Sequence, residues 1–113
     1  NIFNTADVVI FPMIPSTLSE RTYHQVLDFF TDNKYKPKKI VPFFNMVDLR
    51  RKLHKETIEK FSKGKYNCLN TVIPNSSFVE KMGLHQSPIA EYSPTSKPAK
   101  AFLELWKEIK GLV

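Results

Sequence analysis

The fold is decided by one stretch of the sequence, VPFFNMVDLRRKLHKE (Val41 to Glu56). The apolar run from Ile40 to Phe44 predicts a buried strand. This run breaks abruptly at Asn45 and Met46, and a charged, helix-like segment follows. A buried strand with a polar tip is either an ordinary strand-to-helix turn or one wall of a binding site.

Two further apolar runs flank this stretch and complete an alternating pattern. The β-branched run from Asp7 to Ile14 predicts a strand covered on both faces, and Cys68 to Ile73 predicts a third strand, stopped by Pro74. Apolar residues at the 3.6-residue period predict helices from about Glu20 to Asp32 and from about Arg51 to Ser62. The order predicts right-handed crossovers and a doubly wound, parallel α/β sheet.

Local signals refine these elements. Ser16 or Ser19 is predicted to cap the first helix, and Pro42 predicts a bulge or an edge because it cannot donate to a ladder. After the third strand we expect a short helix capped by Asn75 or Ser76, then a loop, then a last helix from near Ser96. The expected inward-facing residues are Tyr23, Val26, Leu27 and Phe30 in the first helix, Leu53, Thr57, Ile58 and Phe61 in the second, and Phe102, Leu105, Trp106 and Ile109 in the last.

Length and composition fit a single globular domain. The 113 residues are 42% hydrophobic and 25% charged, and the longest apolar run is far below the roughly 18 residues of a membrane helix. One cysteine, Cys68, cannot form an internal disulfide, which suits a cytoplasmic protein. Three strands make an incomplete doubly wound sheet, and the chain begins at Asn1 without methionine. We therefore expect residues 1–113 to be one partial domain whose remaining strands precede Asn1.

The positive charge is concentrated in one segment. From Lys34 to Lys65 there are 11 basic and three acidic residues, a net charge of +8, whereas the rest of the chain carries −2. A basic face of this kind is either a solvated surface or a surface that binds phosphates, since nucleic-acid affinity depends largely on Lys and Arg.

Ligands of open parallel sheets bind beyond the carboxyl ends of the strands. Polar or proline-containing tips occur there in all three predicted strands, at Pro12 to Ser16, Asn45 to Arg50 and Pro74 to Ser77. An asparagine at such a tip can donate to and accept from an adenine edge, and a proline beside a methionine offers a flat apolar wall. Asparagine and proline are also ordinary turn residues, so both interpretations stay open.

Several kinds of chemistry are excluded by the residues present. The three glycines (Gly64, Gly83 and Gly111) lie in no Gly-rich phosphate loop. The three histidines (His24, His54 and His85) are about 30 residues apart and form no zinc pattern, so each is interpreted as a surface or packing residue. No nucleophile motif surrounds Cys68, which we expect to be a buried small hydrophobe. We expect no catalytic group and no metal ligand in this segment.

Three stretches, in this order, resemble the C-terminal half of ParA/MinD-type ATPases, a P-loop family with a deviant Walker A motif that includes the Soj partition proteins. These stretches are ADVVIFPMIPSTLS, FFNMVDLRRKL and TVIPNSSFVEKMGLHQSPIAEYSPTSKPAKAF, and they cover nearly the whole chain. The resemblance implies a doubly wound P-loop NTPase fold, with ATP at the strand tips and often between the two subunits of a dimer. Walker A, the switch aspartate and Walker B would lie in the half that is not in this chain.

The resemblance also assigns residues. It implies an adenine-side wall made of Asn45, Met46, Asp48, Pro74 and Asn75. Arg50 matches an arginine used for nonspecific DNA contact in the Soj branch, and Arg51, Lys52 and Lys55 are further DNA-binding candidates. The chain departs from the Soj pattern where arginines usually follow the VIP proline, since Asn75 and Phe78 stand there.

The leading hypothesis is that this chain is the C-terminal portion of a cytoplasmic ParA-like ATPase that partitions or positions DNA or another cargo. ATP and Mg²⁺ are then cofactors of the intact protein, and this segment alone is expected to hold neither. The expected partners are a second copy in an ATP-dependent homodimer, nonspecific DNA and a ParB-like activator, but not a membrane. The alternative hypothesis is a standalone, non-catalytic basic module that binds nucleic acid or protein.

Overall fold

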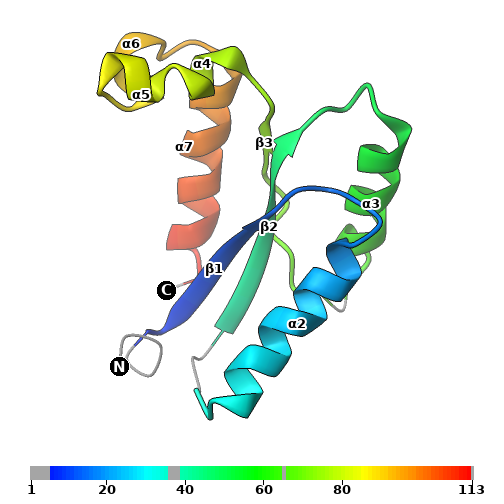
Figure 1. The fold of residues 1–113 in the computed structure, drawn as a ribbon. Helices are drawn as coiled ribbons and strands as arrows, with labels where there is room; N and C mark the ends of the chain where they lie inside the picture. The colour runs from blue at the N-terminus through cyan, green and yellow to red at the C-terminus, as the bar shows by residue number, and fades with distance from the viewer. Residues whose placement is uncertain (1–5, 36–38, 65, 113) are drawn as a thin grey trace.

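The computed structural model describes residues 6–35, 39–64 and 66–112, which form a three-stranded parallel sheet with helices on both faces (Figure 1). The strands are β1 (Val8–Met13), β2 (Lys39–Val47) and β3 (Val72–Pro74), in the order β1-β2-β3. The predicted α/β class with a parallel sheet is therefore confirmed. β2 is the central strand, so its carboxyl end lies between two neighbouring strand tips.

The helices form two layers around this sheet. They are α2 (Ser19–Asp32), α3 (Lys52–Ser62), α4 (Ser77–Glu80), α5 (Met82–His85), α6 (Ile89–Tyr92) and α7 (Lys97–Lys110). In Figure 1, α2 and α3 lie on one side of the strands and α7 lies on the other. The short helices α4 to α6 gather near the first turn of α7, where a loop was predicted for most of their length.

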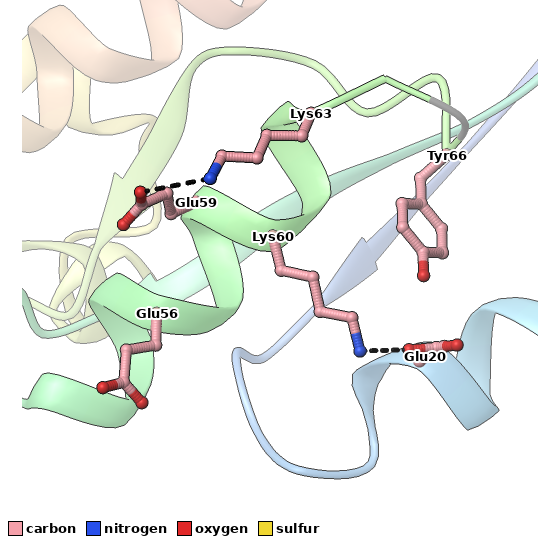
Figure 2. Close-up of a pocket in the computed structure, with 6 residues that line it drawn as sticks. All are labelled: Glu20, Glu56, Glu59, Lys60, Lys63 and Tyr66. Atoms are coloured by element: carbon pink, nitrogen blue, oxygen red, sulfur yellow. Dashed lines mark hydrogen bonds and ion pairs between the residues drawn. The ribbon is translucent and has the colours of Figure 1, made fainter.

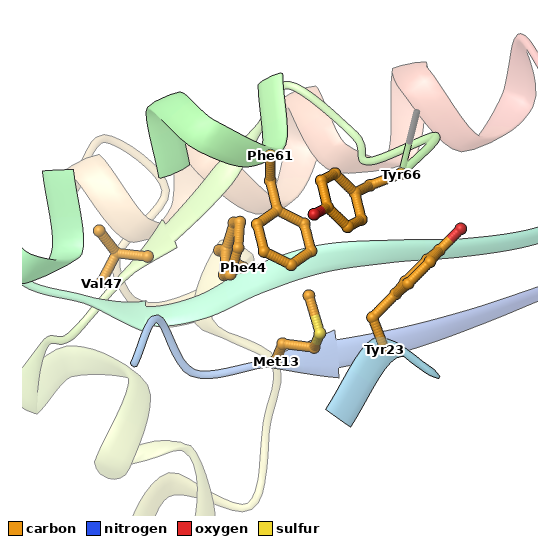
Figure 3. Close-up of a cluster of buried hydrophobic side chains, with 6 residues drawn as sticks. All are labelled: Met13, Tyr23, Phe44, Val47, Phe61 and Tyr66. Carbon is orange, nitrogen blue, oxygen red and sulfur yellow. The ribbon is translucent and has the colours of Figure 1, made fainter. Parts of the chain in front are cut away.

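One hydrophobic cluster joins the sheet to α2 and α3 (Figure 3). Its buried members are Met13, Phe44 and Val47 from the strands, Tyr23 from α2, Phe61 from α3, and Tyr66 from the segment that follows α3. The rings of Phe61 and Tyr66 stack with their centroids 4.1 Å apart, and Phe44 meets Phe61 edge-on at 5.2 Å. Aromatic contacts of this geometry add to the stabilisation from burial alone.

A second cluster joins the sheet to α7. Val41 and Ile73 from the strands pack with Leu69 and Leu105, and all four are buried. Leu105 lies on the predicted inward face of α7, but Trp106 does not, because 55% of its surface is exposed. The predicted inward position of Trp106 is wrong: it lies about 100° around the helix from Leu105 and faces away from the sheet.

The third strand is shorter than predicted. Both oxygens of the Glu108 carboxylate accept hydrogen bonds from backbone N–H groups, one from Asn70 at 3.0 Å and the other from Thr71 at 2.6 Å. These groups are therefore used by α7, and strand pairing begins only at Val72. Cys68 lies before the strand, and burial raises the pKa of its thiol to about 11, as expected for an inert, partly buried cysteine.

The predicted bulge or edge at Pro42 and the predicted serine cap of α2 are both wrong. Pro42 lies in the central strand, is fully buried and marks no bulge. The carbonyl of Pro42 faces the β3 side of β2 and accepts a hydrogen bond from the N–H of Leu69. Because β3 has not yet begun at this point, the N–H that proline lacks is not needed for strand pairing. At the start of α2 the N-cap residue is Leu18, without a side-chain cap, and buried Ser19 instead donates to the carbonyl of Ile14.

Two other helix starts follow the predicted capping chemistry. Ser76 accepts from the N–H of Phe78 at the start of α4, and Ser96 accepts from that of Ala99 at the start of α7. Within the described ranges, none of the helices is both long and apolar enough to cross a bilayer.

Candidate functional site

The tip of β2 contains a β-bulge. Phe44 pairs with Val72 and Val47 pairs with Pro74, so three steps along β2 oppose two steps along β3. The extra residue lets the side chains of Phe44 and Val47 point into the same core cluster, although residues three apart on a regular strand face opposite sides. The bulge therefore re-aims the two residues between them, Asn45 and Met46.

Met46 has the left-handed backbone conformation at this bulge, with φ of 54°. A non-glycine residue in this region is strained, by about 1–3 kcal/mol, and such strain concentrates at functional sites. Its side chain is 45% exposed, so burial of the thioether does not explain why methionine stands here.

The peptide unit between Val47 and Asp48 is held at both ends. Its carbonyl oxygen accepts from the backbone N–H of Asn75 at 2.9 Å, which links it to the tip of β3. Its N–H donates to Nδ1 of His54 at 3.0 Å, which links it to α3. The two strand tips and the first turns of α3 are thereby fixed relative to one another.

A small hollow of about 160 Å³ lies at these joined tips. It is lined by Asn45, Met46, Pro74, Asn75, Ser76, Val79 and Glu80. The structure thus brings together four of the five residues predicted for the adenine side. The hollow combines apolar walls with amide groups that both donate and accept, and with one carboxylate that only accepts.

Asp48 is the predicted member that does not line this hollow. Its carboxylate accepts from the backbone N–H and the side chain of Arg50, with Oδ1 3.0 Å from Nε. These hydrogen bonds from Arg50 hold the pKa of Asp48 at about 2, below its usual range. Asp48 therefore organises the turn after β2.

Three residues of the hollow, all contributed by α4 and its cap, were not among those predicted for the adenine side. Ser76 lay within the predicted tip from Pro74 to Ser77, whereas Val79 and Glu80 were missed. Ser76, Val79 and Glu80 are three and four positions apart, a spacing that places side chains on one face of a helix. This spacing was visible in the sequence, but only the path of α4 from Pro74 turns that face toward β2.

A second hollow of about 420 Å³ lies on the α7 side of the same turn and shares the wall from Pro74 to Ser76. Ser93, Thr95 and Lys97 line it, together with the exposed ring of Phe78. Hydroxyl groups and one ammonium group next to an aromatic ring suit a ligand with polar or anionic substituents.

The four predicted DNA-binding residues lie together at the start of α3, and all are exposed. Arg50 pairs with Asp48 while 91% of its side chain stays accessible, and Lys52 pairs with Glu56 at 3.7 Å. Arg51 and Lys55 have no ion pair within the described residues. We call these four residues the basic segment: Arg50, Arg51, Lys52 and Lys55. Residues 36–38 and 65 of the predicted basic stretch lie outside the described residues.

A larger open groove of about 550 Å³ lies between α2 and α3, away from the strand tips (Figure 2). Figure 2 shows Lys60 reaching from α3 to Glu20 at the start of α2, and Lys63 paired with Glu59. The hydrogen bond from Lys60 to Glu20 raises the pKa of that lysine. The charges in this groove are largely paired with one another, and we assign it no ligand.

Metal chemistry finds no support in the part of the chain that the structure describes. No group of three or more His, Cys, Asp or Glu side chains there is placed to hold an ion. His54 is buried and its Nδ1 accepts a hydrogen bond, so it has a structural role. No protein-family model matches this sequence, and no curated protein matches it significantly.

Proposed function

We propose that this chain is the C-terminal part of a ParA-like P-loop ATPase and supplies the adenine side of its ATP site. The observation that carries the proposal is the hollow at the joined tips of β2 and β3, where Asn45, Met46, Pro74 and Asn75 meet. The carboxyl edge of a parallel sheet is where such folds bind nucleotides.

The size of the hollow supports a shared site. At about 160 Å³ it is smaller than the roughly 300–1,000 Å³ of pockets that enclose a whole small ligand. A flat base fits such a space with the ribose and phosphates outside it. The sequence holds no Gly-rich loop for the phosphates, so the other half of the intact protein would bind them together with Mg²⁺.

The chemistry of the lining suits adenine. The amide of Asn45 can bond the base edge in both directions, and the carboxylate of Glu80 can accept from an exocyclic amino group. Met46 and Pro74 would cover the two faces of the ring. Guanine carries an oxygen where adenine carries its amino group, and this oxygen would meet an acceptor if it faced Glu80.

In the intact protein these residues would bind and orient ATP, while the other half would carry the groups for hydrolysis. Phosphoryl transfer depends mainly on positioning and charge neutralisation around the phosphates, and the proposal assigns the groups for both to the other half. The ATP-dependent homodimer, the nonspecific DNA and the ParB-like activator remain parts of this proposal, with the basic segment as its DNA surface.

The test is ATP binding by the intact protein with Asn45→Ala. Loss of one or two hydrogen bonds should weaken ATP affinity roughly three- to tenfold, measured by calorimetry. Asn70→Ala is the matched control, because Asn70 is exposed, precedes β3 and does not line the hollow. Equal affinities for ATP in both variants, or ATP turnover by the isolated chain of residues 1–113, would overturn the proposal.

The second candidate is a standalone basic module that binds nucleic acid without hydrolysis. It is favoured by the exposure of the whole basic segment on a single turn and helix start. The two candidates differ in what lies upstream of Asn1, since a Gly-rich loop ending in Gly-Lys-Thr or Gly-Lys-Ser belongs only to the ATPase.

A further inference from the structure

His54 occupies an unusual place for a histidine. It lies in the first turn of α3 with only 4% of its surface exposed, next to a helix face that is otherwise charged. Its Nδ1 accepts a hydrogen bond from the backbone N–H of Asp48, so Nδ1 carries no proton and the neutral ring carries its proton on Nε2. The native turn therefore requires neutral His54.

The bond from Asp48 to His54 stands between the two surfaces described above. On one side, the Val47–Asp48 peptide continues from Asn45 and Met46, which line the hollow. On the other side, the Asp48 carboxylate holds Arg50, the first residue of the basic segment. Movement of this one peptide unit would displace both surfaces together.

We propose that His54 is a positioning residue whose neutral ring holds the tip of β2, and whose protonation releases it. Protonation adds an N–H at Nδ1, so two donors face each other and the bond to Asp48 is lost. The effect on adenine binding rests on the proposed function, whereas the release of the turn does not. The geometry of the hollow and of the basic segment thus depends on the protonation state of His54.

Asp48 is the charged residue that the structure places beside His54, through its backbone N–H, and its carboxylate is paired with Arg50. Glu20 of α2 pairs with Lys60, nearly two turns further along α3.

The test follows three backbone amides of the protein, those of Asp48, Asn75 and Leu69, by NMR between pH 8 and pH 5. We expect the hydrogen-exchange protection factor of the Asp48 amide, corrected for intrinsic exchange, to fall at least tenfold as the pH falls from 8 to 5. The Asn75 amide, which bonds the same peptide unit, should follow with the same midpoint, and the Leu69 amide, bonded to Pro42, should not. The ¹⁵N shifts of the His54 ring should show the Nε2–H tautomer at pH 8.

Variants separate a positioning role from mere packing. In His54→Asn the amide oxygen can take the place of Nδ1, so protection at Asp48 should persist while its pH dependence disappears. His24→Asn, on the exposed face of α2, is the control and should keep the wild-type pH profile. An unchanged Asp48 protection factor from pH 8 to 5, or a wild-type profile in His54→Asn, would refute the proposal.

ATP affinity measured at each pH distinguishes the role of His54 from the proposed ATP site. If His54 holds the turn but there is no ATP site, the Asp48 and Asn75 amides will respond to pH while no ATP binding is measured at any pH. If both hold, ATP affinity of the intact protein will fall with the same midpoint as the Asp48 amide. If ATP affinity stays constant while the amides respond to pH, His54 positions the turn but does not regulate ATP binding.

Discussion

The backbone nitrogen of Asn75 lies 2.9 Å from the carbonyl oxygen of Val47, and this hydrogen bond joins the tips of β2 and β3 directly across the bulge. It continues the ladder past the irregular step between Phe44 and Val47. The bulged residues consequently have ordered backbone on both sides, which explains how a strained conformation persists at Met46.

The strain at Met46 can be measured through stability. Because φ is 54°, Met46→Gly should raise the free energy of unfolding by about 1 kcal/mol, while β-branched Met46→Val should lower it by about 1–2 kcal/mol. Urea denaturation would measure both values. Met82→Gly is the control: Met82 lies in α5, where glycine should lower stability instead. A loss of stability in Met46→Gly equal to that in Met46→Val would argue against strain.

The Asp48–Arg50 pair gives a prediction for pH. The folded pKa of Asp48, about 2, lies below its usual value of 3.8, so the pair contributes stability fully above about pH 4 and loses it as the pH falls toward 2. The ¹³C shift of the Asp48 carboxyl should titrate near pH 2 in the wild type and clearly higher in Arg50→Ala. Arg21→Ala, on the exposed side of α2, should leave that titration unchanged. A wild-type titration near 3.8 would contradict the ion pair.

The basic segment can be tested on DNA retention. Replacing Arg50, Arg51 and Lys52 with alanine should weaken binding of duplex DNA and reduce the slope of log K against log salt by up to about 0.9 per lost phosphate contact. Fluorescence anisotropy at several salt concentrations would measure this slope. The control has the same charge change on the opposite layer, in α7: Lys97→Ala, Lys100→Ala and Lys110→Ala. Equal losses in both triple variants would indicate binding by total charge and no specific DNA surface.

The main elements were predictable because they depend on local patterns. The apolar runs of β1 and β2, and the 3.6-residue spacing of apolar residues in α2, α3 and α7, each lie within a short stretch of sequence. The third strand was misplaced because Glu108, more than 35 residues away, takes the N–H groups of Asn70 and Thr71. β1 was expected to be covered on both faces, but Val8 to Phe11 are only half-buried in the described structure.

The site was predictable where it follows from topology. Neighbouring parallel strands end at the same edge, so Asn45 and Pro74 were expected to meet, and they do. Glu80 was missed because its place depends on the direction in which α4 leaves the sheet. Leu53 was expected to face inward, yet it is at the edge of exposure and His54 is buried, because His54 shares one face of α3 with buried Thr57 and Phe61. No local pattern predicts the bond from Asp48 to His54.

At the bulge, the number of residues between Phe44 and Val47 constrains the structure more strictly than their identity does. Val47 enters the same core as Phe44 only because an extra residue separates them. Deleting one residue here would turn Val47 to the opposite layer and shift every later side chain of the turn by one position, including the partners of His54 and Arg50. Inserting or removing a single codon should therefore be far more damaging here than any substitution that preserves the count.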